Sequence, residues 1–250
     1  ATNGSGVATI STTLTANVAV GTFISATATK ATDGTYTALT DTSEFSRNIA
    51  AVSSTQATVT VDTVSDTSDG DTTSLSTLLA NKGADGFISL REAITAANNT
   101  TNGSSIDRIV FNIAGAGTQV INLASNLPSI TGGVEIDGTS QSGWVAGSYL
   151  PVVLDGNGVA GTGLRFSGAA SNSVLKGLVL RNFGNGGWDT IDVSATGVTI
   201  QGNWIGQFNS DGTSAGNAEA NLGSAIRLYS SNAVVGGDTT AERNVLAGSP

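Results

Sequence analysis

The sequence predicts an all-β protein, in which a right-handed parallel β-helix with an N-terminal helical cap follows part of an antiparallel Ig-like β-sandwich. Three features predict this fold. Short Val, Ile and Leu runs alternate with Thr, Ser, Asn and Asp among 33 glycines, as in chains of many strands joined by tight turns. Similar triplets recur roughly 25 to 35 residues apart in the second half of the chain, a spacing typical of solenoids. One amphipathic helix, within residues 88–99, comes directly before these repeats.

The composition excludes several classes of function. The 250 residues carry a formal net charge of −9, which repels phosphate backbones, so nucleic acid is not expected as a partner. The chain has no Cys and no His, which excludes disulfides, thiolate nucleophiles, serine-histidine triads and histidine metal sites. No segment is apolar over the length of a bilayer, so no membrane insertion is expected. Abundant Thr, Gly and Asn without Cys or Met indicate an exported protein, with an extracellular or bacterial cell-surface location.

Residues 1–52 are predicted to be the closing strands of the sandwich. Three segments alternate apolar and polar residues like exposed antiparallel strands, with the turn signal Thr32–Thr35 between the last two: VATISTTL, GTFISATATKA and TSEFSRNIAAV. Three strands with one apolar face do not form a stable fold alone. We therefore expect strands that precede Ala1, or strands of a neighbouring chain, to complete the sheet.

Residues 53–105 are predicted to hold a linker, a strand and the helical cap. The strand is expected at residues 57–62. One or two helical turns are expected in SLSTLLANKG, beginning at Thr73 or Ser74 and ending at Gly83.

The segment ISLREAITAANN carries the strongest helix signal in the chain. Ser89 and Glu92 have the spacing of a capping box, in which each side chain satisfies a free backbone N–H of the first turn. Leu90 and Ile94 lie on the apolar face at helical spacing. Because an open solenoid end exposes apolar interior and unpaired strand edges, we expect this helix to cap the first solenoid turn, with its apolar face buried near Phe111.

Residues 106–250 are predicted to form the β-helix, continuing beyond the 250 residues. Each repeat has three short strands, and stacked repeats place equivalent strands about 4.8 Å apart around an interior column of Ile, Leu and Val. The equivalent triplets are Leu164–Phe166, Ile191–Val193 and Ile226–Leu228 for the first strand; Leu175–Gly177, Ile200–Gly202 and Val235–Gly237 for the second; and Leu178–Leu180, Asn203–Ile205 and Asn244–Leu246 for the third.

The acidic run DTSDGD is the best candidate for a metal site. Asp66, Asp69 and Asp71 surround Gly70, and clustered carboxylates on a glycine-bearing turn can supply oxygen ligands to calcium. The run lacks the distal bidentate Glu of an EF-hand loop, so a solvated acidic turn is the simpler interpretation. Calcium is the one cofactor that the sequence suggests.

Charged residues on equivalent strands allow two interpretations. Arg165, Asp192 and Arg227 occupy the middle of three equivalent triplets, which predicts an alternating charge ladder on an exposed face, without a pocket. The alternative is a polysaccharide-cleaving site that also uses Asp189, Arg181 and Trp188. A hydrolase needs paired carboxylates, and a lyase needs a calcium-binding carboxylate cluster beside a basic residue. Neither occurs as a compact motif, so no catalytic residue is assigned.

Several motifs resemble a family of bacterial surface proteins with a Cys-Ser-Leu-Arg-Glu-Ala signature. ISLREAITAANN followed by IDRIVFNI is similar to that signature, with Ile88 in place of its Cys. NLPSITGGVEIDG, LKGLVLRNF, IQGNWIGQFNSDGTSAGN and VVGGDTTAERNVLAG resemble the repeats of the same proteins, and GTFISATATKATDGTYTALTDTSEFSRNIA is similar to their sandwich strands. The resemblance implies tandem β-helix and sandwich modules in a secreted or surface adhesin, without enzymatic activity.

These observations together predict a structural or adhesive module of a large repeat protein. Its expected partners are neighbouring repeats or copies of itself, and surface glycans are a further candidate. Both ends of the chain are expected to present strand edges, so modules or chains are predicted to join end to end, as in a filament. The alternative is a β-helix that binds or cleaves carbohydrate.

Overall fold

The computed structural model describes residues 56–103, 105–216 and 221–248 in full, and the backbone of four short strands before them. The chain divides into two compact units, residues 1–53 and 54–250. In the first unit, β1 (Phe23–Ile24) pairs antiparallel with β4 (Ile49–Ala50), and β2 (Thr29–Ala31) pairs antiparallel with β3 (Leu39–Thr42). This antiparallel pairing is as predicted. The predicted strand within residues 7–14 lies outside the described residues.

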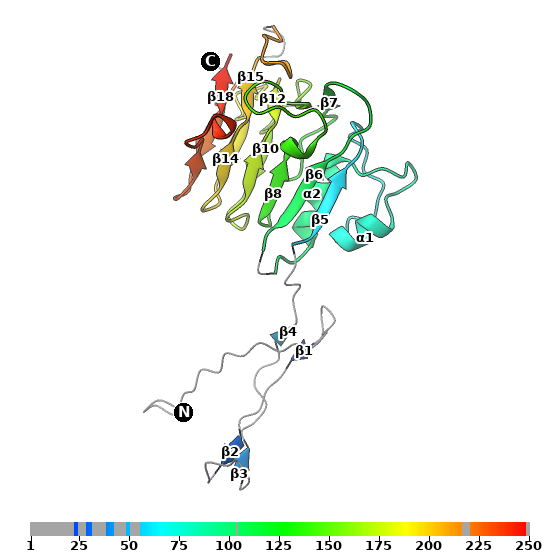
Figure 1. Cartoon of the computed structure of the whole chain (residues 1–250), viewed down its shortest axis with the longest axis vertical. Coiled ribbons are helices and arrows are strands. Elements are labelled where there is room, and N and C mark those ends of the chain that lie inside the picture. The colour runs from blue at the N-terminus through cyan, green and yellow to red at the C-terminus, as the bar shows by residue number, and fades with distance from the viewer. Residues whose placement is uncertain are drawn as a thin grey trace. The chain divides into compact units, whose positions relative to one another are not determined.

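The second unit is built from three parallel sheets (Figure 1). The six-stranded sheet has the order β17-β14-β11-β8-β6-β5, the five-stranded sheet β18-β15-β12-β9-β7, and the three-stranded sheet β10-β13-β16. The strands are β5 (Thr58–Val61), β6 (Asp107–Phe111), β7 (Gln119–Asn122), β8 (Val134–Asp137), β9 (Val152–Asp155), β10 (Leu164–Phe166), β11 (Val174–Lys176), β12 (Val179–Arg181), β13 (Ile191–Val193), β14 (Thr199–Gln201), β15 (Trp204–Gly206), β16 (Ile226–Leu228), β17 (Val234–Val235) and β18 (Val245–Ala247). The protein is therefore β-rich and mostly parallel, as the sequence predicts.

The chain visits the three sheets in a fixed order, so each passage adds one strand to each sheet. β8, β9 and β10 form one layer, β11, β12 and β13 the next, and β14, β15 and β16 the one after. All three predicted sets of equivalent triplets pair in the expected register. Leu164 lies opposite Ile191, for example, and Leu175 lies opposite Ile200.

The interior of the stack is a set of aligned apolar columns. In the six-stranded sheet, Ile109, Ile136, Leu175 and Ile200 follow one another in register, and each is fully buried. Alternate residues along each short strand point inward, which explains why a triplet with apolar first and third positions is the repeating unit. Burial of these columns supplies the main stabilisation of the unit.

Helices are few among the described residues, and the two α-helices lie at the β5 end of the stack. They are α1 (Leu75–Ala80) and α2 (Leu90–Asn99), with the short 3-10 helices η1 (Gly138–Ser140) and η3 (Thr240–Glu242). α1 begins at the predicted N-cap Ser74 but ends at Asn81, earlier than the predicted stop at Gly83. Because β5 and β6 are parallel neighbours, the chain between them needs a crossover, and α1 and α2 belong to that crossover.

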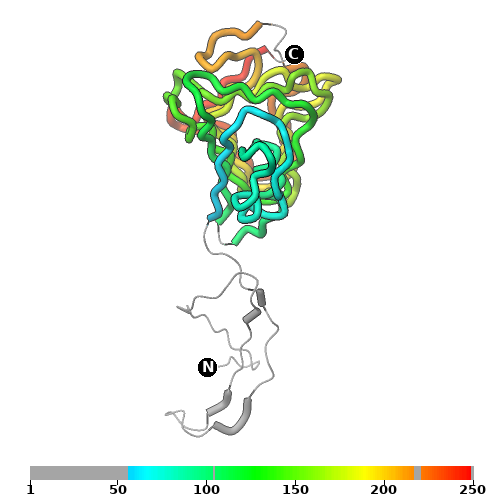
Figure 2. Tube along the Cα trace, turned by 90° about the vertical axis from the view of Figure 1, so that its right-hand side faces the viewer, coloured from blue at the N-terminus to red at the C-terminus, as the bar shows by residue number. Residues whose placement is uncertain are grey.

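Along the stack axis, the helical segment lies within the outline of the layered strands (Figure 2). Leu90 and Ile94 are each 1 % exposed and belong to the same core cluster as Ile109 and Phe111. The structure therefore places the apolar face of α2 against β5 and β6. Neither α1 nor α2, within the described residues, has the length or apolar character that a membrane-spanning helix needs.

Candidate functional site

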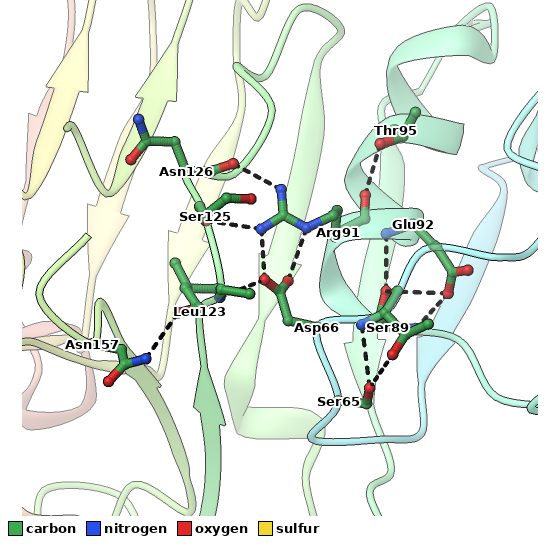
Figure 3. A network of polar contacts seen from close by, with 12 residues as sticks. Ser65, Asp66, Ser89, Arg91, Glu92, Thr95, Leu123, Ser125, Asn126 and Asn157 are labelled. Carbon is green, nitrogen blue, oxygen red and sulfur yellow. Dashed lines mark hydrogen bonds and ion pairs between the residues drawn. The ribbon is translucent and has the colours of Figure 1, made fainter. Parts of the chain in front are cut away.

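Arg91, in the ISLRE segment, makes polar contacts with two other parts of the chain. Arg91 forms a two-pronged ion pair with Asp66, with Nε donating to Oδ1 at 3.0 Å and Nη2 to Oδ2 at 2.6 Å (Figure 3). The same guanidinium donates to the carbonyl oxygens of Ser125 and Asn126 at 2.8 and 2.7 Å. Asp66 also accepts from the N–H of Ala124. Arg91 thus joins the crossover to the connection that follows β7.

Ser89 and Glu92 anchor the start of α2 to the same acidic turn. The predicted capping box is present, because Ser89 Oγ accepts from Glu92 N while Glu92 Oε2 accepts from Ser89 N at 2.9 Å. Glu92 Oε1 also accepts from the N–H groups of Asp69 and Gly70, both at 2.7 Å. Ser89 Oγ donates to the carbonyl oxygen of Thr67. Both side chains are 1 % exposed, so their roles are structural.

The three aspartates considered for calcium make protein contacts of their own. Asp66 is occupied by an arginine, Asp69 Oδ2 accepts from the N–H of Ala84 at 2.8 Å, and Asp71 Oδ1 accepts from the N–H of Thr73. Hydrogen bonds with Thr73 lower the pKa of Asp71. In the part of the chain that the structure describes, no group of three or more acidic residues is placed to hold a metal ion. The carboxylates serve as acceptors for turn N–H groups, which sequence spacing alone does not distinguish from cation ligation.

Ile88, at the position of the signature Cys, is 1 % exposed and belongs to the core. Its N–H donates to Asp62 Oδ1 at 2.6 Å, and its carbonyl accepts from the N–H of Asp62. The backbone at this position is therefore fixed by Asp62, while the side chain fills apolar space.

The predicted charge ladder has the expected register but a different environment. Arg165 lies opposite Asp192, and Asp192 lies opposite Arg227. Arg165 Nη2 lies 3.6 Å from Asp192 Oδ2, whereas Arg227 Nη2 forms its ion pair with Asp189 Oδ1 at 3.1 Å. Asp192 is only 7 % exposed, so the prediction of a fully exposed ladder is wrong at its centre.

The prediction that this ladder avoids any pocket is also wrong. Eight residues line a surface hollow of ≈ 280 Å³, which we call the Trp188 groove: Arg165, Gly186, Gly187, Trp188, Asp189, Asp192, Arg227 and Tyr229. An adjoining hollow of ≈ 200 Å³ shares Arg165 and Trp188 and continues past Asn126, Ser129 and Thr162. Trp188 is 49 % and Tyr229 62 % exposed. Asp189 and Trp188, named for the alternative polysaccharide site, therefore do lie beside the ladder residues, whereas Tyr229 was not identified from the sequence.

Arg181 does not join these residues. It lies on β12, in the five-stranded sheet, where Nε pairs with Asp155 Oδ2 at 2.9 Å and Nη1 donates to Asn209 Oδ1. The set of residues considered for polysaccharide cleavage is therefore divided between two sheets.

A second charge network, which the sequence analysis missed, lies on the six-stranded sheet. Arg108 pairs with Glu135 at 3.3 Å and with Asp137, and Lys176 pairs with the same two carboxylates at 2.6 and 3.3 Å. Burial acts to lower the pKa of Lys176, but the hydrogen bond to Glu135 and the charge of Asp137 outweigh it and raise that pKa. Each of the two basic residues thus pairs with both carboxylates of the strand that lies between them.

Two asparagines, one buried and one half-buried, hold the corner between the six-stranded and five-stranded sheets. Asn203 is fully buried, its Oδ1 accepts from Leu178 N, and its Nδ2 donates to the carbonyl of Leu175. In the next layer, Asn244 Oδ1 accepts from Asn203 N and Nδ2 donates to the carbonyl of Ile200. Polar residues within an apolar triplet were the sequence signal for these corner residues, since a buried amide must find backbone partners.

The layer of β16, β17 and β18 forms an open face of the stack. Its residues occupy positions that are fully buried one layer earlier, yet Leu228 and Val235 are each 45 % exposed and Leu246 is 51 % exposed. In the preceding layer the matching residues Ile200 and Ile205 are 0 % exposed. This open face combines unpaired strand edges with an apolar surface.

Comparisons with protein-family models, with curated proteins and with solved structures found no match to this chain.

Proposed function

We propose that this chain is a non-enzymatic structural or adhesive module of a large bacterial surface or secreted repeat protein. In this proposal residues 54–250 form a right-handed parallel β-helix with a helical cap, and residues 1–52 form part of an Ig-like sandwich. The module joins its neighbours through strand pairing at the open face of β16, β17 and β18. The resemblance of the ISLREA segment and the repeats to bacterial adhesins supports the surface location.

The open face carries this proposal. Leu246 and Val235 extend the apolar columns that run through Ile205 and Ile200, with the same register as the buried layers. A further layer of strands is the occupant that fits, because each inner layer of the stack is covered by the strands of the next layer. Exposed strand edges with apolar side chains otherwise drive association.

The two ends of the stack differ, which gives the module a direction. At the other end, α2 contacts β5 and β6 with its apolar face, and no comparable helix lies against β17 or β18 among the described residues. Assembly by strand pairing is therefore assigned to the open face.

Sedimentation of the 250-residue protein tests the proposal. Copies should associate through their open faces as concentration rises, and Val235→Asp together with Leu246→Asp should abolish that association. Leu79→Asp is the matched control, because Leu79 is 50 % exposed on α1, at the helical end, and its substitution should leave association unchanged. A protein that stays monomeric at all concentrations, or that associates equally in both variants, contradicts the proposal.

A further inference from the structure

The Trp188 groove combines exposed aromatic rings with paired charges. Trp188 is 49 % and Tyr229 62 % exposed, although large aromatic side chains gain free energy from burial. The chain reverses direction just before Trp188 through Gly186 and Gly187, whose φ angles are 87° and 85°. These left-handed conformations favour glycine, so the loop that presents Trp188 depends on them.

The polar lining of the groove is arranged to offer both hydrogen-bond donors and acceptors. Arg165 and Arg227 are nearly half exposed, with side-chain exposures of 45 % and 46 %, above two carboxylates that are 10 % and 7 % exposed. Asp189 Oδ1 is buried and accepts no hydrogen bond of its own among the described residues, although Arg227 lies 3.1 Å away. Arg227 Nη1 donates to Tyr229 Oη at 3.1 Å. Asp192 Oδ2 lies 3.6 Å from Arg165 Nη2, too far for a hydrogen bond, so acceptor capacity remains at this carboxylate.

The charges within the groove indicate the class of ligand. Two arginines and two aspartates cancel, so the groove offers no net attraction to an anion, while the whole chain carries −9. A neutral sugar chain matches this lining, because each hydroxyl both donates and accepts a hydrogen bond and the C–H face of a pyranose ring can lie on an indole. The two adjoining hollows of ≈ 280 and ≈ 200 Å³ together have the scale of a small-molecule site.

We propose that the Trp188 groove is a binding site for a neutral oligosaccharide. Trp188, shared by both hollows, is the stacking platform, and Asp192 accepts hydrogen bonds from sugar hydroxyls while Arg165 and Arg227 donate to ring and hydroxyl oxygens. The site binds without cleaving, because glycoside hydrolysis needs one carboxyl group free to donate a proton, and both carboxylates here face a guanidinium group. This inference is independent of the assembly proposed for the open face.

Calorimetric titration of the whole 250-residue protein tests the site, with cellohexaose, xylohexaose, mannohexaose and hexagalacturonate as probes. At least one neutral hexasaccharide should bind, and Trp188→Ala should weaken its Kd about tenfold or more, the loss expected for one stacking contact. Phe87→Ala is the matched control, because Phe87 is also 49 % exposed but lies outside both hollows.

Asp192→Asn supplies a second variant that keeps the shape of the side chain, and it should also weaken binding while the far-ultraviolet circular dichroism spectrum stays unchanged. Binding of hexagalacturonate alone, binding of none of the neutral probes, or equal effects of Trp188→Ala and Phe87→Ala would each overturn the proposal. Release of shorter sugars from a bound probe would overturn the assignment of binding without cleavage.

Discussion

The ion pair between Arg91 and Asp66 is one of the polar contacts that attach α2 to the rest of the unit. Substitution of Arg91 by Met keeps most of the aliphatic stem but removes every donor of the guanidinium. Asp66, whose side chain is 5 % exposed, then keeps the N–H of Ala124 and loses both prongs of its ion pair. The carbonyl oxygens of Ser125 and Asn126 lose their donors as well. Loss of one partner from a buried ion pair costs about 3–5 kcal/mol, so the free energy of unfolding should fall by that amount.

Urea denaturation followed by tryptophan fluorescence measures the free energy of unfolding of residues 54–250. Trp144, Trp188 and Trp204 all belong to the unit of residues 54–250, so the signal does not report on residues 1–53. A double-mutant cycle with Asp66→Asn should give a coupling energy of about 1–3 kcal/mol between the two positions.

Lys82 supplies the matched control for this experiment. Its ammonium group pairs with Asp62 at 2.7 Å, but the two side chains are 35 % and 24 % exposed. Exposed ion pairs contribute about 0–1 kcal/mol to the free energy of unfolding. Lys82→Met should therefore lower that free energy much less than Arg91→Met does. If the two substitutions cost the same, or if Arg91→Met costs under about 1 kcal/mol, the reasoning from burial is refuted.

Two further predictions concern a buried carboxyl group and a close backbone contact. Burial raises the pKa of Asp107, against the opposing hydrogen bond from Ala57 N, so its charged form destabilises the fold; stability should fall as pH rises from about 3.8 through the raised pKa. Asp107→Asn should therefore raise the melting temperature at neutral pH, with a difference that disappears below pH 3.8. Gly138→Ala should lower the free energy of unfolding by about 1–3 kcal/mol, because the added Cβ would clash with the carbonyl oxygen of Gly177. Gly168→Ala should leave the free energy of unfolding nearly unchanged, because a Cβ at Gly168 meets nothing within 4 Å.

Each of these predictions has a clear contrary result. An Asp107→Asn variant that is less stable than the parent at neutral pH would show that the carboxylate is stabilising there. Equal melting temperatures for the two glycine variants would show that the layers at Gly138 separate without cost.

Local sequence patterns predicted those features that depend on neighbouring residues. The triplets ending at Phe166, Val193 and Leu228 lie in register because the alternation of strand residues and the apolar interior permit only one alignment. The capping box of Ser89 and Glu92 was equally predictable, because its two members lie one helical turn apart.

Contacts between residues far apart in the sequence could not be predicted, because they depend on the lengths and paths of the loops between the strands. Asp66 is 25 residues from Arg91, so no local pattern predicts their ion pair. The sequence around Asp66 shows only a cluster of aspartates, which suggested calcium. Trp188 and Tyr229 reach one groove only because the loops before β13 and after β16 turn toward the same face.

The sequence by itself determined the repeat, the register and the helix, since periodicity and capping act over a few residues. Tertiary structure alone decided which carboxylates meet arginines, which meet backbone N–H groups and which line a groove. The physical reason is that a carboxylate has the same local preferences in a cation site, an ion pair or a turn, and only its final neighbours and burial distinguish these environments.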